Sequence, residues 1–482
     1  MPIDRSTLFI GGGWVAPSSS SRVTALNAAT EDILGTVPEA DLADVDRAVA
    51  AARNAVDNSE WSATSPADRA AAMNRFADAM EKRSAELTRT VSQENGMPIG
   101  LSEAFEGGFA TGLIRYYAEL ATAMAEEETR PSQTGLETVV RRSPVGVVAA
   151  IVPWNYPVVL AMSKIAPALA AGCTVVVKPS PPATVLDSFI VAEALEAADL
   201  PPGVVNWVPG GPDIGAYLVS HPGVDKVAFT GSTAAGRSIA TACANLLRPV
   251  TLELGGKSAA ILLDDVDLDA IMGDLQFIMF MNNGQTCVTC GRILAPTHRY
   301  AEVVDALATQ VSSLRVGDPL DPSTDIGPMA TGAHRERVES YIEKGRGEAR
   351  LVAGGGRPTG LEKGWFVEPT VFACTSNDAT IAKEEIFGPV LAVIPYDDEG
   401  DAVRIANDSS YGLGGTVFSA DTERAKEIAR QVHTGTIGVN GYPLAIGSPF
   451  GGVKDSGIGR EFGPEALHNY QDLKSMYIAG RA

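Results

Sequence analysis

The chain has few cysteines, few histidines and little positive charge for its length. Its 482 residues include five cysteines and five histidines. Such a sparse and odd number of cysteines is typical of a reducing compartment and not of a disulfide scaffold, so we expect a cytoplasmic protein. The 59 acidic residues outnumber the 38 basic residues, which gives a net charge of −21. This charge argues against nucleic acid or an anionic membrane as a partner.

Long apolar runs are also missing. The most apolar segment, residues 143–180, is interrupted by Pro153, Pro157, Lys164 and Pro167, so it offers no uninterrupted span of membrane length. The N-terminal "MPIDRSTLFIGGGWV" has no charged flank followed by an apolar run, and no secretory signal is expected. The length instead predicts two or three domains with a large core.

Strands and helices alternate along most of the chain. "GVVAAIVP" and "CTVVVKPS" predict two buried strands, and a helix over 158–172 lies between them and ends at Gly172. This alternation continues to "VTLELGG" at 250–256, and a second alternating set runs from about 259 to about 447. The pattern predicts an α/β fold with a Rossmann-like doubly wound domain, which is typical of nucleotide binding.

Other segments have simpler patterns. Residues 42–58 and 66–96 predict amphipathic helices, and the second helix opens at Ser65-Pro66. Residues 125–144 predict a hairpin with polar flanks that belongs to neither sheet.

The sequence lacks the G-x-G-x-x-G motif of many dinucleotide-binding proteins. "FTGSTAAGRS" (229–238) is the best substitute, because a glycine-rich turn between a strand and a helix presents backbone N–H groups to a pyrophosphate. The segment also resembles a P-loop, but Arg237 stands where that motif has lysine, which disfavours an NTPase. From the pattern alone, a tight structural turn is as probable as dinucleotide binding.

Two of the cysteines form a C-x-x-C pair in "MNNGQTCVTCGR" (281–292). A structural zinc site needs four ligands, and the other cysteines and the histidines have no suitable spacing. A redox pair would open a helix, whereas Cys287 follows a long apolar helix that Asn283-Gly284 would cap. We therefore interpret Cys290 as a buried bystander and Cys287 as the candidate reactive thiol.

Seven motifs together resemble those of the NAD(P)-dependent aldehyde dehydrogenases. They are "PWNYP" (153–157), "KPS" (178–180), "FTGSTAAG" (229–236), "LELGGKS" (252–258), "GQTC" (284–287), "EEIFGPV" (384–390) and "PFGGVKDSGIGRE" (449–461). Each motif is weak alone, but they occur in the family's order and approximate spacing over nearly the whole chain. The sequence is therefore identified as a member of that superfamily.

The resemblance implies a catalytic set of Cys287, Asn155, Glu253 and Lys178. Cys287 aligns with the nucleophile, whose thiolate would add to the aldehyde and form a thiohemiacetal. Asn155 aligns with the amide that, with the Cys287 backbone N–H, would stabilise the oxyanion. Hydride transfer leaves a thioester, and Glu253 aligns with the general base that activates water to hydrolyse it. Without the resemblance, Glu253 would be interpreted as a salt-bridged residue at a strand end, and Asn155 as part of an Asx-type turn.

The resemblance also implies NAD as the cofactor, with NADP as the alternative. Lys178 aligns with the residue that holds the adenosine ribose, Ser232 with the pyrophosphate contact, and Glu385 and Phe387 with the nicotinamide end. Many NAD-preferring members carry a Glu where this chain has Pro181, and its loss removes a repulsion against a 2′-phosphate. NAD is still preferred, because no Arg or Lys other than Lys178 lies nearby to recognise that phosphate. The predicted cofactor-binding set is Ile151, Pro153, Trp154, Lys178, Ser180, Pro181, Gly211, Phe229, Gly231, Ser232, Leu254, Glu385 and Phe387, and no metal site is expected.

The substrate is expected to be an apolar aliphatic or aromatic aldehyde. Tyr156 is the one aromatic residue recognised near the site, and no charged partner for a substrate is evident. The other candidate contacts are Leu160, Met162, Ser163, Met281, Thr286 and Val288.

Alternative functions are a CoA-acylating relative, a non-catalytic binder and a P-loop NTPase. Acylating relatives generally lack the water-activating Glu, so Glu253 argues against the first. A non-catalytic binder is disfavoured because Cys287, Asn155 and Glu253 are all intact. A P-loop NTPase is disfavoured by Arg237.

The resemblance also suggests how the chain is divided. Residues 1–123 and 146–254 would form the dinucleotide-binding domain, and residues 255–447 an α/β catalytic domain. Residues 124–145 and 465–482 would form a small β-hairpin oligomerisation element. This organisation predicts a homodimer or a homotetramer.

Overall fold

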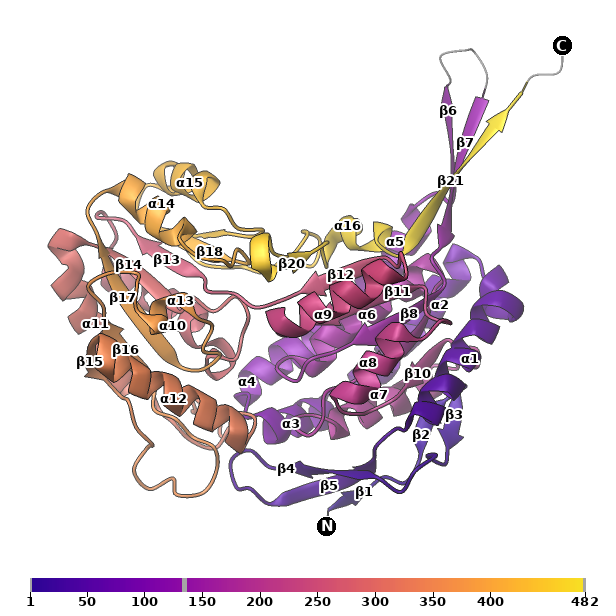
Figure 1. Ribbon diagram of the computed structural model, residues 1–482, viewed down its shortest axis with the longest axis horizontal. Coiled ribbons are helices and arrows are strands. Elements are labelled where there is room, and N and C mark those ends of the chain that lie inside the picture. The colour runs from indigo at the N-terminus through magenta and orange to yellow at the C-terminus, as the bar shows by residue number, and fades with distance from the viewer. Residues whose placement is uncertain (1, 132–136, 480–482) are drawn as a thin grey trace.

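The computed structural model describes residues 2–131 and 137–479. Two large sheets each carry helices on both faces, and a three-stranded arm stands out from the body (Figure 1). This is the α/β arrangement that the sequence predicts. Within the described residues, no helix is long and apolar enough to cross a membrane.

The first large sheet is doubly wound. Its strand order is β10-β9-β8-β11-β12-β20, and only β20 runs antiparallel to its neighbour. The first five strands in chain order therefore lie 3-2-1-4-5, and the order reverses between β8 and β11. Sheets of this kind bind ligands beyond the carboxyl ends of the strands at that reversal. The strands are β8 (Val147–Ile151), β9 (Thr174–Lys178), β10 (Val205–Trp207), β11 (Lys226–Thr230), β12 (Val250–Glu253) and β20 (Gly457–Ile458).

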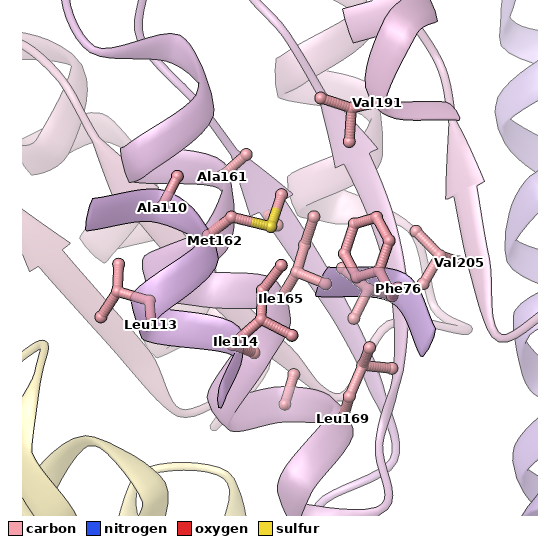
Figure 2. Packing of buried hydrophobic residues seen from close by; sticks show 14 of the residues in the cluster. Phe76, Ala110, Leu113, Ile114, Ala161, Met162, Ile165, Leu169, Val191 and Val205 are labelled. Atoms are coloured by element: carbon pink, nitrogen blue, oxygen red, sulfur yellow. The ribbon is translucent and has the colours of Figure 1, made fainter. Parts of the chain in front are cut away.

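Alternate side chains of this sheet enter two different helical layers, because successive strand residues point to opposite faces. Figure 2 shows one layer, where Phe76, Ile114 and Ile165 from three helices pack together. Burial of each such side chain contributes about 1.5–3 kcal/mol. This layer contains α2 (Pro66–Lys82), α3 (Ser84–Asn95), α5 (Ala110–Ala123), α6 (Pro157–Ala171) and α7 (Leu186–Ala197), and the opposite layer contains α1 (Leu42–Asn58), α8 (Pro212–Ser220) and α9 (Thr233–Asn245).

The second large sheet has the order β15-β16-β17-β14-β13-β18-β19 and is parallel except for β15. Its strands are β13 (Ala259–Leu262), β14 (Arg292–Pro296), β15 (Arg350–Ala353), β16 (Thr370–Ala373), β17 (Val390–Tyr396), β18 (Gly415–Phe418) and β19 (Gly438–Val439). One face packs on α10 (Leu268–Phe280) and α11 (Tyr300–Ser313), and the other on α12 (Gly332–Glu348), α14 (Glu399–Asn407) and α15 (Thr422–Gln431).

The predicted hairpin is present and forms part of the arm. β6 (Glu127–Pro131) pairs antiparallel with β7 (Glu137–Pro144), and β21 (Gln471–Ile478) pairs with the other edge of β7. β7 and β21, which belong to the two segments of the predicted oligomerisation element, therefore lie side by side (Figure 1). Its role in oligomerisation and the proposed domain boundaries stay predictions.

Two features differ from the sequence prediction. The single helix predicted over 66–96 is two helices, because Arg83 leaves helical geometry with ψ near 6° and its guanidinium pairs with Glu86 and Glu193. No glycine or proline marks this break, and Glu193 belongs to α7. The N-terminal strands were not predicted either; they are β1 (Ile3–Asp4), β2 (Leu8–Ile10), β3 (Gly13–Val15), β4 (Arg22–Leu26) and β5 (Ile33–Pro38).

Candidate active site

Cys287 lies on a loop that two asparagines hold in place. After α10, Asn282 and Asn283 take left-handed backbone angles, with φ of 50° and 60°. The Asn282 side chain donates to the backbone carbonyl of Asn155 at 2.8 Å. The Asn283 side chain donates to two further carbonyls at 2.8 and 3.0 Å. The chain therefore leaves the helix sharply, near the predicted cap, and presents Cys287 on a fixed loop.

Two cavities meet at Cys287. The first has a volume of about 280 Å³ and a largely apolar lining, and the second, of about 490 Å³, lies at the reversal of the first sheet. Among the described residues, only Asn155 and Cys287 line both. Cys287 is half-buried, so its sulfur is not walled off by packed side chains. A thiol in this position can meet a substrate on one side and a dinucleotide on the other.

The surroundings of Cys287 favour the neutral thiol. Burial is the largest cause that raises the pKa of Cys287 above the ordinary range, and the carboxyl groups of Glu385 and Glu253 raise it further. Backbone N–H groups of Cys287 and Val288 act in the opposite direction. Forming a thiolate here therefore needs a nearby positive charge or a proton acceptor.

Asn155 follows β8 and is hydrogen-bonded to the loop that carries Cys287. Its side-chain Nδ2 donates to the carbonyl of Gln285 at 3.0 Å, and its own carbonyl accepts from the side chains of Asn95 and Asn282 at 3.1 and 2.8 Å. The side chain is 3% exposed and lines both cavities. The amide has a second hydrogen to donate, so it can serve an oxyanion formed next to Cys287.

Glu253 ends β12 in a buried and unpaired state. Both carboxyl oxygens lack a hydrogen-bond partner among the described residues. Burial, followed by the charge of Glu461, raises the pKa of Glu253 well above its ordinary value, while Lys164 lowers it. Lys164 bonds Glu461 at 2.6 Å and not Glu253. Glu253 is thus not the salt-bridged strand-end residue that the sequence left open.

The second cavity continues along the glycine-rich turn after β11. Ser232 caps α9 through its side chain, which accepts from Ala235 N at 3.3 Å. The first N–H groups of α9 face an anion-binding position of the kind found at helix N-termini. Arg237 pairs with Asp455 at 2.8 Å and is 68% exposed, so it does not take the place of a P-loop lysine.

Seven of the predicted cofactor residues line this cavity: Pro153, Trp154, Gly231, Ser232, Leu254, Glu385 and Phe387. Six others do not: Ile151, Lys178, Ser180, Pro181, Gly211 and Phe229. Lys178 ends β9, the strand next to β8, and lines neither cavity that Cys287 lines. The place of Lys178 in the catalytic set therefore stays a prediction.

Local contacts show the structural roles of Ser180, Gly231 and Phe229. Ser180 Oγ donates to the carbonyl of Val152 at 2.7 Å, which joins the ends of β8 and β9. A Cβ on Gly231 would lie 2.5 Å from the ring of Phe229, so only glycine fits there. The ring of Phe229 therefore packs against the turn at Gly231 and does not line the second cavity.

The far end of the second cavity contains residues that sequence reasoning missed. His334 on α12 lies 5.0 Å from the ring of Trp154, and its Nε2 bonds the carbonyl of Phe387 at 2.7 Å. Phe387 has a φ of 65°, which is strained for a bulky residue. Burial lowers the pKa of His334 to about 4, so the ring is neutral at pH 7. A lone histidine far along the chain gave no local signal.

Glu385 is fixed beside these rings. Its Oε1 accepts from Gly256 N at 2.9 Å, and burial raises its pKa to about 7. Arg337 donates to the Glu385 backbone carbonyl at 2.9 Å and also lines the cavity, and it was not predicted.

The apolar cavity contains more aromatic side chains than Tyr156, the one that the two sequence segments near the site offered. Tyr156, Leu160, Met281, Thr286 and Val288 line the apolar cavity as predicted, but Met162 and Ser163 are fully buried elsewhere. Other helices and loops bring further apolar side chains to this cavity, and among them only Phe450 lies in one of the seven sequence motifs. They are Phe105, Phe109, Phe277, Tyr442, Leu444, Phe450 and Phe462.

Cys290 is 1% exposed and packs in the apolar layer with Ile278 and Ile293. This agrees with its interpretation as a buried bystander.

Comparison with known proteins identifies the class. A family model described as the aldehyde dehydrogenase family matches residues 14–476. The chain therefore belongs to the aldehyde dehydrogenase family, as its motifs indicate. Among individual relatives, a geranial dehydrogenase of Castellaniella defragrans is 60% identical over 480 residues, with 100% of both chains covered.

Solved structures agree in fold over the whole chain. An aldehyde dehydrogenase of Mycobacterium tuberculosis complexed with NAD+ is 48% identical, with a TM-score of 0.97 and 99% of each chain covered. A mutant aldehyde dehydrogenase of Pseudomonas syringae complexed with NAD+ and octanal is 39% identical, with a TM-score of 0.94 and coverage of 98% of this chain and 96% of that chain.

Proposed function

We propose that the protein oxidises an apolar aldehyde to its carboxylic acid, with NAD as hydride acceptor and a covalent intermediate on Cys287. One observation carries the proposal: Cys287 lines an apolar cavity on one side and the cleft at the sheet reversal on the other. The NAD+ bound by the M. tuberculosis relative supports the choice of cofactor.

The chain's own residues fit a dinucleotide in the larger cavity. The N-terminus of α9 offers N–H groups to a pyrophosphate, and Ser232 leads into it. Glu385 and Phe387 would hold the nicotinamide end, with Trp154 and His334 packed around Phe387. Because His334 is neutral, it would place no positive charge beside the nicotinamide ring, which is cationic in NAD+.

In the first half-reaction the Cys287 thiol releases its proton to water in the cavity. Sγ then forms a bond to the carbonyl carbon, and the carbonyl π bond breaks so that the oxygen becomes an oxyanion. Asn155 Nδ2 and the Cys287 backbone N–H donate to that oxygen, and losing one such donor costs about 3 kcal/mol of transition-state stabilisation. When bound, NAD supplies the acceptor for the hydride that leaves this carbon, after which a thioester remains on Cys287.

In the second half-reaction Glu253 takes a proton from water, whose oxygen attacks the thioester carbon. The carbon–sulfur bond then breaks and the acid leaves. The carboxyl group suits this task because it is buried, has no hydrogen-bond partner in the part of the chain that the structure describes, and has a raised pKa. A CoA-acylating enzyme would not need this base, so Glu253 favours hydrolysis.

The apolar lining selects the substrate. A charged aldehyde would lose its hydration in this cavity without gaining an ion pair, which is costly. Relatives named for geranial, or solved with octanal, fit an uncharged apolar chain.

An absorbance assay for reduced cofactor tests the proposal. With NAD+, we expect kcat/KM for octanal, geranial and benzaldehyde to exceed that for betaine aldehyde and succinic semialdehyde by about 100-fold or more. Cys287→Ser should abolish turnover but retain NAD+ binding, and Cys290→Ser serves as the matched control. Turnover that survives Cys287→Ser would overturn the nucleophile assignment. Preference for a charged aldehyde would overturn the substrate class.

A further inference from the structure

The end of β9 lacks an expected carboxylate. In doubly wound dinucleotide domains, an acidic residue at this strand end commonly accepts hydrogen bonds from the adenosine ribose. Here the strand ends at Lys178 and continues as Pro179, Ser180, Pro181 and Pro182, with no acid. Lys178 alone would attract a 2′-phosphate as readily as a ribose.

A carboxylate reaches the same edge from a distant part of the chain. Glu39 lies between β5 and α1, and its Oε1 accepts from Gly211 N at 3.2 Å. Its Oε2 accepts from Ser21 Oγ at 2.7 Å. The next residue, Ala40, donates its N–H to the carbonyl of Pro209 at 2.8 Å, which ties this backbone to the loop after β10.

Glu39 also interacts with Lys178. Burial lowers the pKa of Lys178 to about 8, and the charge of Glu39 acts against this effect. The Lys178 side chain packs on α8, where a Cβ on Gly215 would lie 3.6 Å from its Cδ. Lys178, Glu39 and Gly211 therefore meet where the ends of β9 and β10 approach the start of α8.

The Glu39 carboxylate retains acceptor capacity. Of its about four lone-pair positions, the contacts with Gly211 and Ser21 use two. Both Glu39 and Gly211 are only partly buried, so a ligand can approach them. A ribose diol needs such acceptors, whereas a phosphate carries its own negative charge and would be repelled.

We propose that Glu39 replaces the missing carboxylate at Pro181, accepts hydrogen bonds from the adenosine ribose hydroxyls of NAD and disfavours the 2′-phosphate of NADP. This inference rests on the proposed function, because it requires the dinucleotide to extend along this edge. A purely structural role for Glu39 would be to accept from Gly211 at the start of α8. Glu39→Gln separates the two roles, since the amide oxygen still accepts from Gly211 while the charge is lost.

The test measures dissociation constants for NAD+ and NADP+ by calorimetry, independently of turnover. We expect Glu39→Gln to lower the ratio Kd(NADP+)/Kd(NAD+) by about tenfold or more, and Glu39→Asp to keep the ratio of the wild type. The control Glu302→Gln removes one exposed negative charge on α11 and should leave the ratio unchanged. Melting curves for all variants show whether they fold, and Glu39→Ser offers a second charge-free variant.

Each outcome is decisive. A ratio that stays within twofold of the wild type in both charge-free variants would overturn the role of Glu39 while leaving the proposed function intact. An equal fall in Glu302→Gln would assign the effect to net charge and also overturn it. Failure of the wild type to bind either dinucleotide would remove the proposed function and this inference together.

Discussion

At the scale of single residues, Asn155 and Glu253 are held in opposite ways. Asn155 is fixed by hydrogen bonds at its side chain and its carbonyl, as an oxyanion donor must be to act without reorganisation. Glu253 has no hydrogen-bond partner among the described residues, which leaves it free to approach a water molecule. A Cβ on Gly451 would lie 2.5 Å from Glu253 Oε1, so glycine at that position provides the necessary space.

The role of Glu253 can be tested at this scale. In Glu253→Gln we expect a burst of reduced cofactor of about one equivalent per active site, followed by turnover slowed by about 100-fold or more. The reason is that the first half-reaction does not need the base, whereas thioester hydrolysis does. Stopped-flow absorbance measures both phases. Full steady-state activity in Glu253→Gln would contradict the assignment.

At the scale of elements, the start of α6 depends on a distant acid. Glu106, in the helical segment Glu103–Phe109, is fully buried, and its Oε2 accepts from Val158 N and Val159 N at 2.7 and 3.1 Å. These two N–H groups follow Asn155 by only a few residues. Glu106 therefore holds the helix that begins immediately after the candidate oxyanion donor.

Glu106 should make stability depend on pH. Burial raises its pKa from 4.5 to about 8, so the folded protein binds a proton more tightly than the unfolded chain. This contribution is complete below about pH 4.5 and is lost as the pH rises through 8. In Glu106→Gln, which does not titrate, we expect Tm relative to the wild type to increase by about 2–5 °C between pH 5 and pH 8.

Glu103→Gln is the matched control, because Glu103 is exposed on the same segment. Differential scanning calorimetry across this pH range measures the effect. A difference between Glu106→Gln and the wild type that does not change with pH would contradict the prediction.

At the scale of the whole molecule, the arm exposes apolar side chains on a sheet of only three strands. Leu473 and Tyr477 on β21 are 67% and 83% exposed. Small sheets with uncovered apolar residues gain stability when another surface covers them. The arm therefore supports the prediction of a homodimer or homotetramer.

We expect the double variant Leu473→Lys and Tyr477→Lys to weaken self-association by about 100-fold or more, since two large apolar side chains lose their cover. Light scattering over a dilution series measures the assembly state. Lys474→Ser changes a neighbouring exposed residue and should leave assembly intact. An unchanged oligomer in the double variant would contradict the role of the arm.

Much of the fold could be predicted from local pattern. The helix over 42–58 was predicted with the bounds of α1, because its apolar spacing is a local pattern. The strands β8 and β9 and the helix between them were found for the same reason. The break at Arg83 was missed, since its cause includes an ion pair with Glu193, more than a hundred residues away.

Some residues of the candidate site were predicted from the sequence, and others were missed. Most of the motif residues that line the two cavities lie on loops or at the ends of strands and helices, where local sequence is distinctive. His334 and most aromatic side chains of the apolar cavity, apart from Tyr156 and Phe450, lie outside the motifs and come from separate helices and loops. Lys178 was placed in the catalytic set, but it lines neither cavity at Cys287, and its catalytic role stays a prediction.

The sequence by itself determined the α/β class, the family and the choice of Cys287 as the candidate thiol, because these depend on periodicity and on short motifs whose order is fixed along the chain. Only the tertiary structure decided that Cys287 stands between two cavities, that Glu253 has no hydrogen-bond partner among the described residues, and that the charge of Glu39 acts on Lys178 at the end of β9. Such contacts join residues far apart in the chain, and their distances and electrostatic effects exist only once the sheets and helices have packed.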